Sequence, residues 1–337
     1  MSTVLRLEMT EPGVLDDLAF KPTTRRPPGL GEVEIEAIAV GLNFREVLKA
    51  LGMYPEGTSS FLGYRDAQGT LTFDGDCAGR VVAVGAGVTD LQVGDPVLAF
   101  APTGFSSFVT LPRFTVVPKP DHLSFAEAVT IPGTFLTAYY ALHHRGQIRA
   151  GETILIHAAT GGCGLAALQL SQRAGAKVLA TAGKPEKRAF LRALGVEQVM
   201  DSRSLDFGDE VMAYTEGRGV DLVLNSLAGA FLTRSLTLLA PFGRFLELGR
   251  MDIYQDTPVG LYPFRNNLTF HALDLQQLAP APFMALFQEV MQLFVARELQ
   301  PLPYQIFPKD DIVRAFRHMR KANHIGKVVV AMQAEEP

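Results

Sequence analysis

Short apolar segments separated by turn residues dominate the first third of the chain. The turns include glycine clusters such as Gly85-Ala86-Gly87, and this pattern predicts a series of short β-strands. One helix is expected among them, over residues 43–51. The predicted strands are 33–40, 78–84, 96–100 and 108–111.

From residue 125 onward, strands alternate with helices. Ser124 and Glu127 have the spacing of a capping box, which opens a helix. Residues 153–157 are apolar almost throughout, as expected of a strand covered on both faces of a parallel sheet. The alternation predicts a doubly wound α/β domain. Its further elements are helices over 164–174, 185–194 and about 282–297, and strands over 177–181, 198–200, 222–225 and 244–248; a last strand is expected over 327–331.

This order of elements predicts an α/β protein in which one domain is inserted into another. A chain of 337 residues is long enough for two domains. We expect a β-rich, substrate-binding domain over residues 1–124 and 300–337. A Rossmann nucleotide-binding domain is expected over residues 125–299.

Composition excludes several classes of function. The formal net charge of −4 gives no basic surface for nucleic acid, and no apolar run is long enough to span a membrane. The first residues carry acids where a signal peptide needs an apolar stretch, so we expect a cytoplasmic protein. The only cysteines, Cys77 and Cys163, and the scattered histidines have no metal-ligand spacing, so no metal site is expected.

A glycine-rich loop over residues 158–164 (AATGGCG) directly follows the apolar strand and precedes a helix. Such a turn places free backbone N–H groups and the positive end of a helix dipole at one point. Glycines there allow close approach of a pyrophosphate. The loop therefore predicts a dinucleotide site, with a merely tight turn as the alternative.

Three cations follow the next two strands. NAD enzymes usually place an acid at the end of the second strand, to accept the ribose 2′-OH, but this strand ends at Thr181-Ala182-Gly183-Lys184. Lys184, Lys187 and Arg203 would instead bind a 2′-phosphate, which predicts NADPH as the cofactor. The alternative is that they are solvated cations at helix ends.

With these residues in hand, the chain resembles the enoyl-reductase domains of type I polyketide synthases and of animal-type fatty acid synthase. These belong to the zinc-free, quinone-reductase-like branch of the medium-chain dehydrogenase/reductase superfamily. The motifs that carry the resemblance span nearly the whole chain: residues 40–46 (VGLNFRE), 51–55 (LGMYP), 77–79 (CAG), 130–132 (TIP), 135–140 (FLTAYY), 158–164, 221–227 (DLVLNSL), 243–249 (GRFLELG) and 324–328 (HIGKV).

The resemblance implies a GroES-like fold for the substrate domain. It also implies NADPH-dependent reduction of the α,β double bond of an enoyl thioester. The substrate would arrive on the phosphopantetheine arm of an acyl carrier protein, and the other domains of a synthase would be partners.

The resemblance also implies roles for single residues. Tyr54 matches a tyrosine held near the α-carbon of the substrate, although it could simply pack in the turn before Pro55. Lys187 and Asp206 match a suggested proton-donating pair, but Lys187 also suits phosphate binding and Asp206 could be a plain loop acid. Lys327 resembles a cofactor-contacting lysine, with an edge-strand lysine as the alternative. The expected cofactor contacts are Asn43, Thr160, Gly161, Gly162, Cys163, Gly164, Thr181, Gly183, Lys184, Lys187, Arg203, Asn225, Ser226, Leu227, Gly249 and Lys327.

Two departures from the family pattern bear on function. Cys163 replaces the usual valine of the loop, and its small side chain should be tolerated. The segment 56–73, between the Tyr-Pro turn and the Cys-Ala-Gly strand, is several residues longer than expected. It would either reshape the site beside Tyr54 or form an inert surface loop. Two other functions stay open: reductive closure of a cyclopropane from a γ-halogenated enoyl thioester, and a non-catalytic NADPH-binding structural module.

Overall fold

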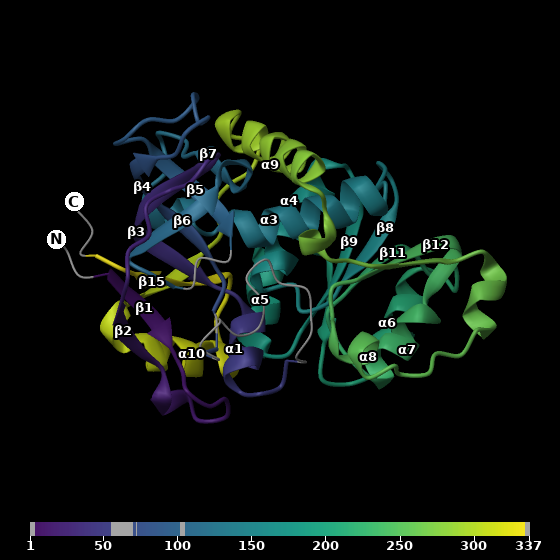
Figure 1. Cartoon of the computed structure of the whole chain (residues 1–337). Coiled ribbons are helices and arrows are strands. Elements are labelled where there is room, and N and C mark those ends of the chain that lie inside the picture. Colours follow the sequence, from purple (N-terminus) through teal and green to yellow (C-terminus); the bar gives the residue numbers. More distant parts are fainter. Residues whose placement is uncertain (1–3, 55–69, 72, 102–104, 334–337) are drawn as a thin grey trace. The chain divides into compact units, whose positions relative to one another are not determined.

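The computed structural model describes residues 4–54, 70–71, 73–101 and 105–333. The chain divides into two compact units, and Figure 1 labels many of their helices and strands. The β-rich unit comprises Met1–Gly133 and Gln276–Pro337, and the parallel-sheet unit comprises Thr134–Leu275. Among the described residues, no helix has both the length and the apolar character needed to cross a membrane.

The β-rich unit is built on a sheet with strand order β14-β15-β3-β4-β5-β7, and β6 also pairs with β3. The pairs are antiparallel except for β14 and β15, which run parallel. A separate antiparallel pair is formed by β1 and β2. The strands are β1 (Val4–Glu8), β2 (Ala19–Thr23), β3 (Glu32–Leu42), β4 (Gly75–Val84), β5 (Pro96–Ala101), β6 (Phe108–Pro112), β7 (Val116–Pro118), β14 (Tyr304–Pro308) and β15 (Lys327–Ala331).

Helices of the β-rich unit are α1 (Phe44–Ala50), α2 (Phe125–Ala128), α9 (Pro280–Val295) and α10 (Ile312–Arg320). The predicted capping box is present: Ser124 Oγ accepts from the Glu127 N–H, and the Glu127 carboxylate accepts from the Ser124 N–H. Helix α3 (Pro132–Tyr139) begins at the end of this unit and continues as a π-helical turn over Tyr140–Arg145.

The parallel-sheet unit has the strand order β10-β9-β8-β11-β12-β13, with all neighbours parallel. Consecutive strands lead away from β8 on one side and from β11 on the other, so the topological switch point lies between these two strands. The strands are β8 (Thr153–Ile156), β9 (Lys177–Ala182), β10 (Gln198–Asp201), β11 (Val220–Asn225), β12 (Leu239–Glu247) and β13 (Thr269–Ala272).

Helices on opposite sides of this sheet, such as α4 and α7, bury its strands (Figure 1). The core includes Leu155, Leu179, Val223 and Phe245, one from each of four neighbouring strands, which explains why these strands read as nearly continuous apolar runs. The helices are α4 (Gly162–Arg173), α5 (Pro185–Ala193), α6 (Phe207–Tyr214), α7 (Ala230–Leu236) and α8 (Met251–Tyr254). The presence of a doubly wound unit and a β-rich unit in one chain confirms the predicted fold class.

The unit boundaries differ from the expected domains, 1–124 with 300–337 and 125–299. Residues 125–133 and the whole of α9 fall in the β-rich unit instead. The reason for α9 is aromatic packing, since the Phe283 ring lies 5.4 Å from the Phe100 ring and 6.3 Å from that of Phe114. The apolar spacing of a helix identifies its buried face but not the sheet on which that face packs.

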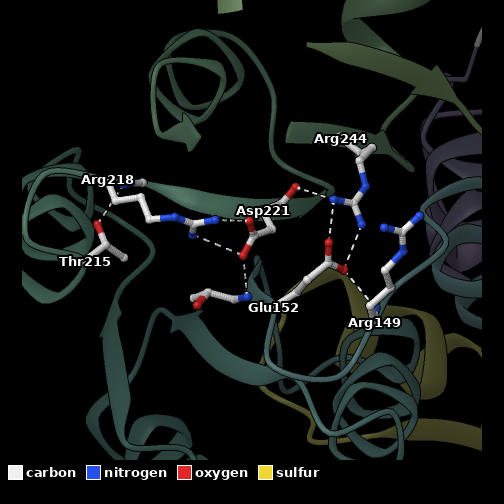
Figure 2. Close-up of polar contacts among 8 residues, drawn as sticks. Arg149, Glu152, Thr215, Arg218, Asp221 and Arg244 are labelled. Atoms are coloured by element: carbon white, nitrogen blue, oxygen red, sulfur yellow. Dashed lines mark hydrogen bonds and ion pairs between the residues drawn. The ribbon is translucent and has the colours of Figure 1, made fainter. Parts of the chain in front are cut away.

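A charged network joins the amino ends of β8 and β11 to Arg244 of β12 in the parallel-sheet unit, as Figure 2 shows. Asp221, at the start of β11, accepts from the Thr153 N–H of β8 at 2.8 Å and pairs with Arg218. Arg244 of β12 pairs with Glu152 at 2.8 Å. Since Arg244 is in register with Leu222, this network lies at the edge of the sheet opposite the carboxyl ends of the strands.

Candidate functional site

The glycine-rich loop joins the carboxyl end of β8 to helix α4. Its backbone is fixed by two hydrogen bonds, from the Ala159 N–H to the Thr181 carbonyl at 3.0 Å and from the Gly161 N–H to the Ala158 carbonyl at 2.9 Å. Helix α4 begins at Gly162, with Gly161 as its N-cap. N–H groups in the first turn of a helix have no acceptor within that helix, so this turn is suited to bind an anion.

Gly164 is the position that makes the loop tight. A Cβ atom there would lie 2.6 Å from the Cα of Ala159 and 2.7 Å from the Ala158 carbonyl oxygen. Only glycine lets the first turn of α4 pack this closely on the end of the strand. The predicted cofactor residues Thr160 to Gly164 are thus brought together in one turn whose shape suits a pyrophosphate.

His157 directly precedes this loop and was not predicted as a functional residue. It is buried; its Nδ1 lies 3.0 Å from Thr181 Oγ1 and its Nε2 lies 2.8 Å from Ser235 Oγ. Because Ser235 Oγ donates to the Phe231 carbonyl, it accepts from His157 Nε2, and Nδ1 accepts from Thr181. Burial lowers the pKa of His157 to about 3, so the ring is neutral. Thr181, predicted as a cofactor contact, therefore has its side chain directed to His157.

The three predicted cations gather at the carboxyl end of β9. The Nε of Arg203 would lie 3.0 Å from a Cβ at Gly183, so the arginine side chain covers that glycine. Burial lowers the pKa of Lys187, and the neighbouring charges of Lys184 and Arg203 lower it further. Like charges held this close to one another form a ready site for a phosphate, whose negative charge would relieve their repulsion.

Asp206 lies at the start of α6, where its carboxylate is exposed and its N–H donates to Ser204 Oγ at 3.1 Å. The electrostatic neighbours that shift the pKa of Lys187 are both cations. The proton-donating pair of Lys187 and Asp206 stays a prediction.

At the ends of β11 and β12, two turns carry the predicted residues Asn225, Ser226, Leu227 and Gly249. Asn225 is fully buried, and its Nδ2 donates to the Leu227 carbonyl at 2.7 Å and to Glu247 Oε2 at 2.5 Å. Ser226, by contrast, is exposed just after the carboxyl end of β11. The side chain of Asn225 thus shapes the turn, and contact of residues 225, 226, 227 and 249 with the cofactor stays a prediction.

Glu247 is a site residue that sequence reasoning missed. It ends β12, is buried, and accepts from the Gly249 N–H through Oε1 at 2.5 Å. Burial raises its pKa to about 8, although the hydrogen bonds from Asn225 and from the Gly249 N–H oppose the shift. The available signal was a lone glutamate at the end of an apolar strand, within the motif 243–249.

In the β-rich unit, Asn43 and Lys327 are brought together. Lys327 Nζ donates to Asn43 Oδ1 at 2.5 Å and to Asp76 Oδ2 at 2.6 Å, and the lysine is buried. The other oxygen of Asp76 accepts from the Gly133 N–H at 2.9 Å. β15 pairs with β14 on one side and β3 on the other, so the alternative of an edge-strand lysine is wrong. Contact of Asn43 and Lys327 with the cofactor stays a prediction.

Tyr54 is buried in the β-rich unit beside a group of charges, of which Glu46, Lys49 and Asp74 are buried and Arg45 is half-buried. Lys49 Nζ lies 3.1 Å from Asp74 Oδ2, and the Asp74 N–H donates to Glu46 Oε2 at 2.8 Å. Burial works to lower the pKa of Arg45, but Glu46 and Asp74 outweigh it and raise that pKa, and Tyr54 adds to the effect. Tyr54 therefore lies within the electrostatic reach of Arg45.

Most of the long segment 56–73 lies outside the described residues, so its predicted effect on the site is untested. Among the residues that the structure does describe, no group of three or more His, Cys, Asp or Glu side chains is arranged to hold a metal ion. Burial raises the pKa of the Cys77 thiol to about 12, which disfavours the thiolate that zinc binds. These residues do not fit a zinc site.

Two protein-family models match the chain. The alcohol dehydrogenase GroES-like domain matches residues 29–139, and the zinc-binding dehydrogenase family matches residues 194–330. Their order agrees with a GroES-like domain followed by a dinucleotide-binding domain. Together with the loop and cation cluster, they define an oxidoreductase of the medium-chain dehydrogenase/reductase class.

Solved structures resemble the chain over its whole length. The CurK enoyl reductase is 44% identical with a TM-score of 0.88, and the match covers 98% of this chain and all of that one. The CurF ER cyclopropanase from the curacin A pathway is 37% identical with a TM-score of 0.91, over 98% of this chain and all of that one. The chain belongs to the enoyl reductases, which confirms the resemblance inferred from its motifs.

Curated relatives are much longer proteins. A phenolphthiocerol/phthiocerol polyketide synthase of Mycobacterium tuberculosis is 40% identical over 333 residues, which are 97% of this chain but 15% of the relative. Phthioceranic/hydroxyphthioceranic acid synthase from the same organism is 43% identical over 331 residues, again 97% of this chain and 15% of the relative. The chain is thus related to one part of polyketide synthases. NADPH, the cofactor predicted from the sequence, fits both this family and the three cations at β9.

Proposed function

We propose that the chain uses NADPH to reduce the α,β double bond of an enoyl thioester carried on an acyl carrier protein. The observation that carries the cofactor assignment is the cluster of Lys184, Lys187 and Arg203 at the end of β9, next to the loop that follows β8. The substrate class is supported by the 44% identity to an enoyl reductase.

The residues of the parallel-sheet unit would bind and orient the cofactor. The first turn of α4 would hold the pyrophosphate, and the cations at β9 would hold the 2′-phosphate. When bound, NADPH supplies a hydride to the β-carbon of the alkene. Orientation is the main contribution of the protein, because hydride transfer requires a short and aligned approach.

The proton that completes the reduction is added at the α-carbon. Tyr54 is our proposed donor for this proton, with the Lys187–Asp206 pair as the alternative. Enolate charge that develops before protonation could be stabilised by backbone N–H donors.

The experiment is a reaction of the purified protein with a crotonyl-pantetheine thioester and NADPH deuterated at C4 of the nicotinamide. We expect loss of NADPH absorbance and one deuterium at the β-carbon of the butyryl product. If the protein binds NADPH in calorimetry but reduces neither the crotonyl-pantetheine thioester nor crotonyl-carrier protein, the proposal of an enoyl substrate is wrong. A preference of the protein for NADH would overturn the assignment of NADPH as the cofactor.

A second candidate is favoured by the 37% identity to an ER cyclopropanase. With a γ-chloro enoyl thioester, hydride would add to the β-carbon, and the α-carbon of the enolate would attack the γ-carbon as chloride leaves. Incubation of this substrate with NADPH decides between the two outcomes. A saturated product that retains chlorine removes cyclopropane formation, whereas a ring with release of one chloride establishes it.

The same relatives support a proposal for partners and location. The chain matches a small part of polyketide synthases, so we propose that it works beside other synthase domains and receives its substrate from their carrier protein. A cytoplasmic location is proposed for the same reason. Cross-linking of the protein to a carrier domain loaded with a reactive pantetheine analogue tests the partnership.

A further inference from the structure

A set of short hydrogen bonds joins the two turns at the ends of β11 and β12. Glu247 Oε2 accepts from Asn225 Nδ2 at 2.5 Å, and Oε1 accepts from the Gly249 N–H at 2.5 Å. The backbone adds a third link, from the Leu248 N–H to the Asn225 carbonyl at 2.8 Å. Both side chains are buried, at 0% and 2% exposure for Asn225 and Glu247, so the contacts are protected from water.

The geometry demands two acceptors at position 247. The orientation of the Asn225 amide is fixed, because its Oδ1 accepts from the Leu227 N–H at 3.2 Å while its Nδ2 donates to the Leu227 carbonyl at 2.7 Å. Nδ2 therefore also faces Glu247 as a donor, as does the Gly249 N–H. A carboxylate satisfies both donors, whereas a glutamine has one acceptor oxygen only.

These turns lie along the path that the dinucleotide would follow. The 2′-phosphate cations are at β9 and the pyrophosphate loop at β8, and β11 and β12 are the next strands in the sheet order. In an open parallel sheet a ligand lies across the carboxyl ends of the strands at the switch point, here between β8 and β11. The nicotinamide half would consequently reach the turns after β11 and β12.

We propose that Glu247 is a positioning residue, which through Asn225 and the Gly249 N–H holds these two turns in the arrangement that the nicotinamide half of the cofactor requires. This inference rests on the proposed function. Glu247 is not itself a catalytic residue, since both its oxygens are occupied by donors inside the protein.

The packing around Gly249 supports a precise spacing. A Cβ at Gly249 would lie 2.6 Å from Glu247 Oε1, so the turn backbone rests directly on the carboxylate. The charged groups nearest to Glu247 are Arg250, which pairs with Asp274 at 3.0 Å, and Asp252, which accepts from the Gly229 N–H at 2.9 Å. Asp252 thereby adds a link between the segments that follow β11 and β12, while Glu247 supplies the buried side-chain link from Asn225 to Gly249.

The test compares two ligands by calorimetry: NADPH, and adenosine 2′,5′-bisphosphate, which has the 2′-phosphate but no nicotinamide. At pH about 9, where Glu247 is ionised, we expect E247Q to weaken NADPH about tenfold, as loss of one hydrogen bond to a charged group does, and to leave the bisphosphate unchanged. The value of kcat for crotonyl thioester should fall, while KM for that substrate stays within about twofold of the wild type.

Glu152→Gln is the matched control. It removes the same charge from the same unit, but at the amino edge of the sheet, where Glu152 pairs with Arg244 (Figure 2). We expect it to change neither ligand. Lys187→Ala is the opposite control and should weaken both ligands, because both carry the 2′-phosphate.

Folded E247Q that binds NADPH like the wild type, or that loses both ligands equally, would overturn the proposal. Should E247Q not fold, the wild-type protein decides: a ratio of the two dissociation constants that stays constant while Glu247 ionises between pH about 7 and 9 also overturns the proposal. Failure of wild-type protein to bind NADPH would instead overturn the proposed function.

Discussion

Lys327 and Asn43 meet in the β-rich unit, where the lysine Nζ donates to the asparagine Oδ1 at 2.5 Å although 284 positions separate them in the chain. Asp76 completes the contact by accepting from the same Nζ at 2.6 Å. A buried ammonium held in this way is costly to disturb, because removal of one partner leaves the other charge buried alone.

Lys327→Met should therefore lower the free energy of unfolding by about 3–5 kcal/mol, since it leaves the Asp76 carboxylate without its cation. Urea unfolding followed by circular dichroism measures the change. Lys321→Met, at an exposed lysine, is the control and should stay within about 0.5 kcal/mol of the wild type. A Lys327→Met protein as stable as the control would contradict the role of the ion pair.

Cofactor choice is tested at β9. Lys187→Ala or Lys184→Ala should weaken NADPH about tenfold and NADH much less, because only NADPH carries the 2′-phosphate. The control is Lys177→Ala, an exposed lysine at the opposite end of the same strand. Equal losses for the two cofactors in binding titrations would show that these lysines do not contact the phosphate.

His157 should make stability depend on pH. Its pKa is about 3 in the folded protein, against about 6.5 in an unfolded chain, so the unfolded state binds the proton first as the pH falls. The stabilisation is present above pH about 6.5 and is lost toward pH 3, by up to about 5 kcal/mol. Unfolding free energies of His157→Gln, compared with those of His122→Gln at an exposed histidine, should lack this slope between pH about 6.5 and 4.5. The same slope in both variants would exclude His157 as its source.

Gly164→Ala should disrupt the phosphate loop. Its Cβ would collide with the backbone of Ala159, so the first turn of α4 must move away from the strand and NADPH should bind at least about tenfold more weakly. Gly260→Ala is the control, because a Cβ there meets nothing within 4 Å. If calorimetry gives the same NADPH affinity for both variants, the loop does not bind the pyrophosphate.

Protonation of Glu247 should weaken NADPH relative to adenosine 2′,5′-bisphosphate. With a pKa of about 8, the carboxyl gains a proton as the pH falls and can then no longer accept freely from both Asn225 and Gly249. The ratio of the two dissociation constants removes effects of the β9 cations, which both ligands contact. We expect NADPH to gain affinity relative to the bisphosphate from pH about 7 to 9 in the wild type and not in E247Q. A constant ratio in the wild type would contradict the link.

Local sequence determined the elements whose causes are local. Residues 153–164 encode an apolar strand, a glycine turn and a helix start within twelve consecutive positions, and each feature depends on its immediate neighbours. The lysines at 184 and 187 are likewise fixed to one strand end by the elements that flank them. Fold class, family and the cation cluster could therefore be predicted.

Only the tertiary structure decided which distant residues meet. Glu247 became recognisable when the register of β11 and β12 placed it beside Asn225, and His157 when its ring was enclosed by Thr181 and Ser235. The same holds for α9, whose Phe283 packs on Phe100 and Phe114 of the β-rich unit. Side-chain burial and strand register arise from packing of the whole chain, so no local pattern specifies them.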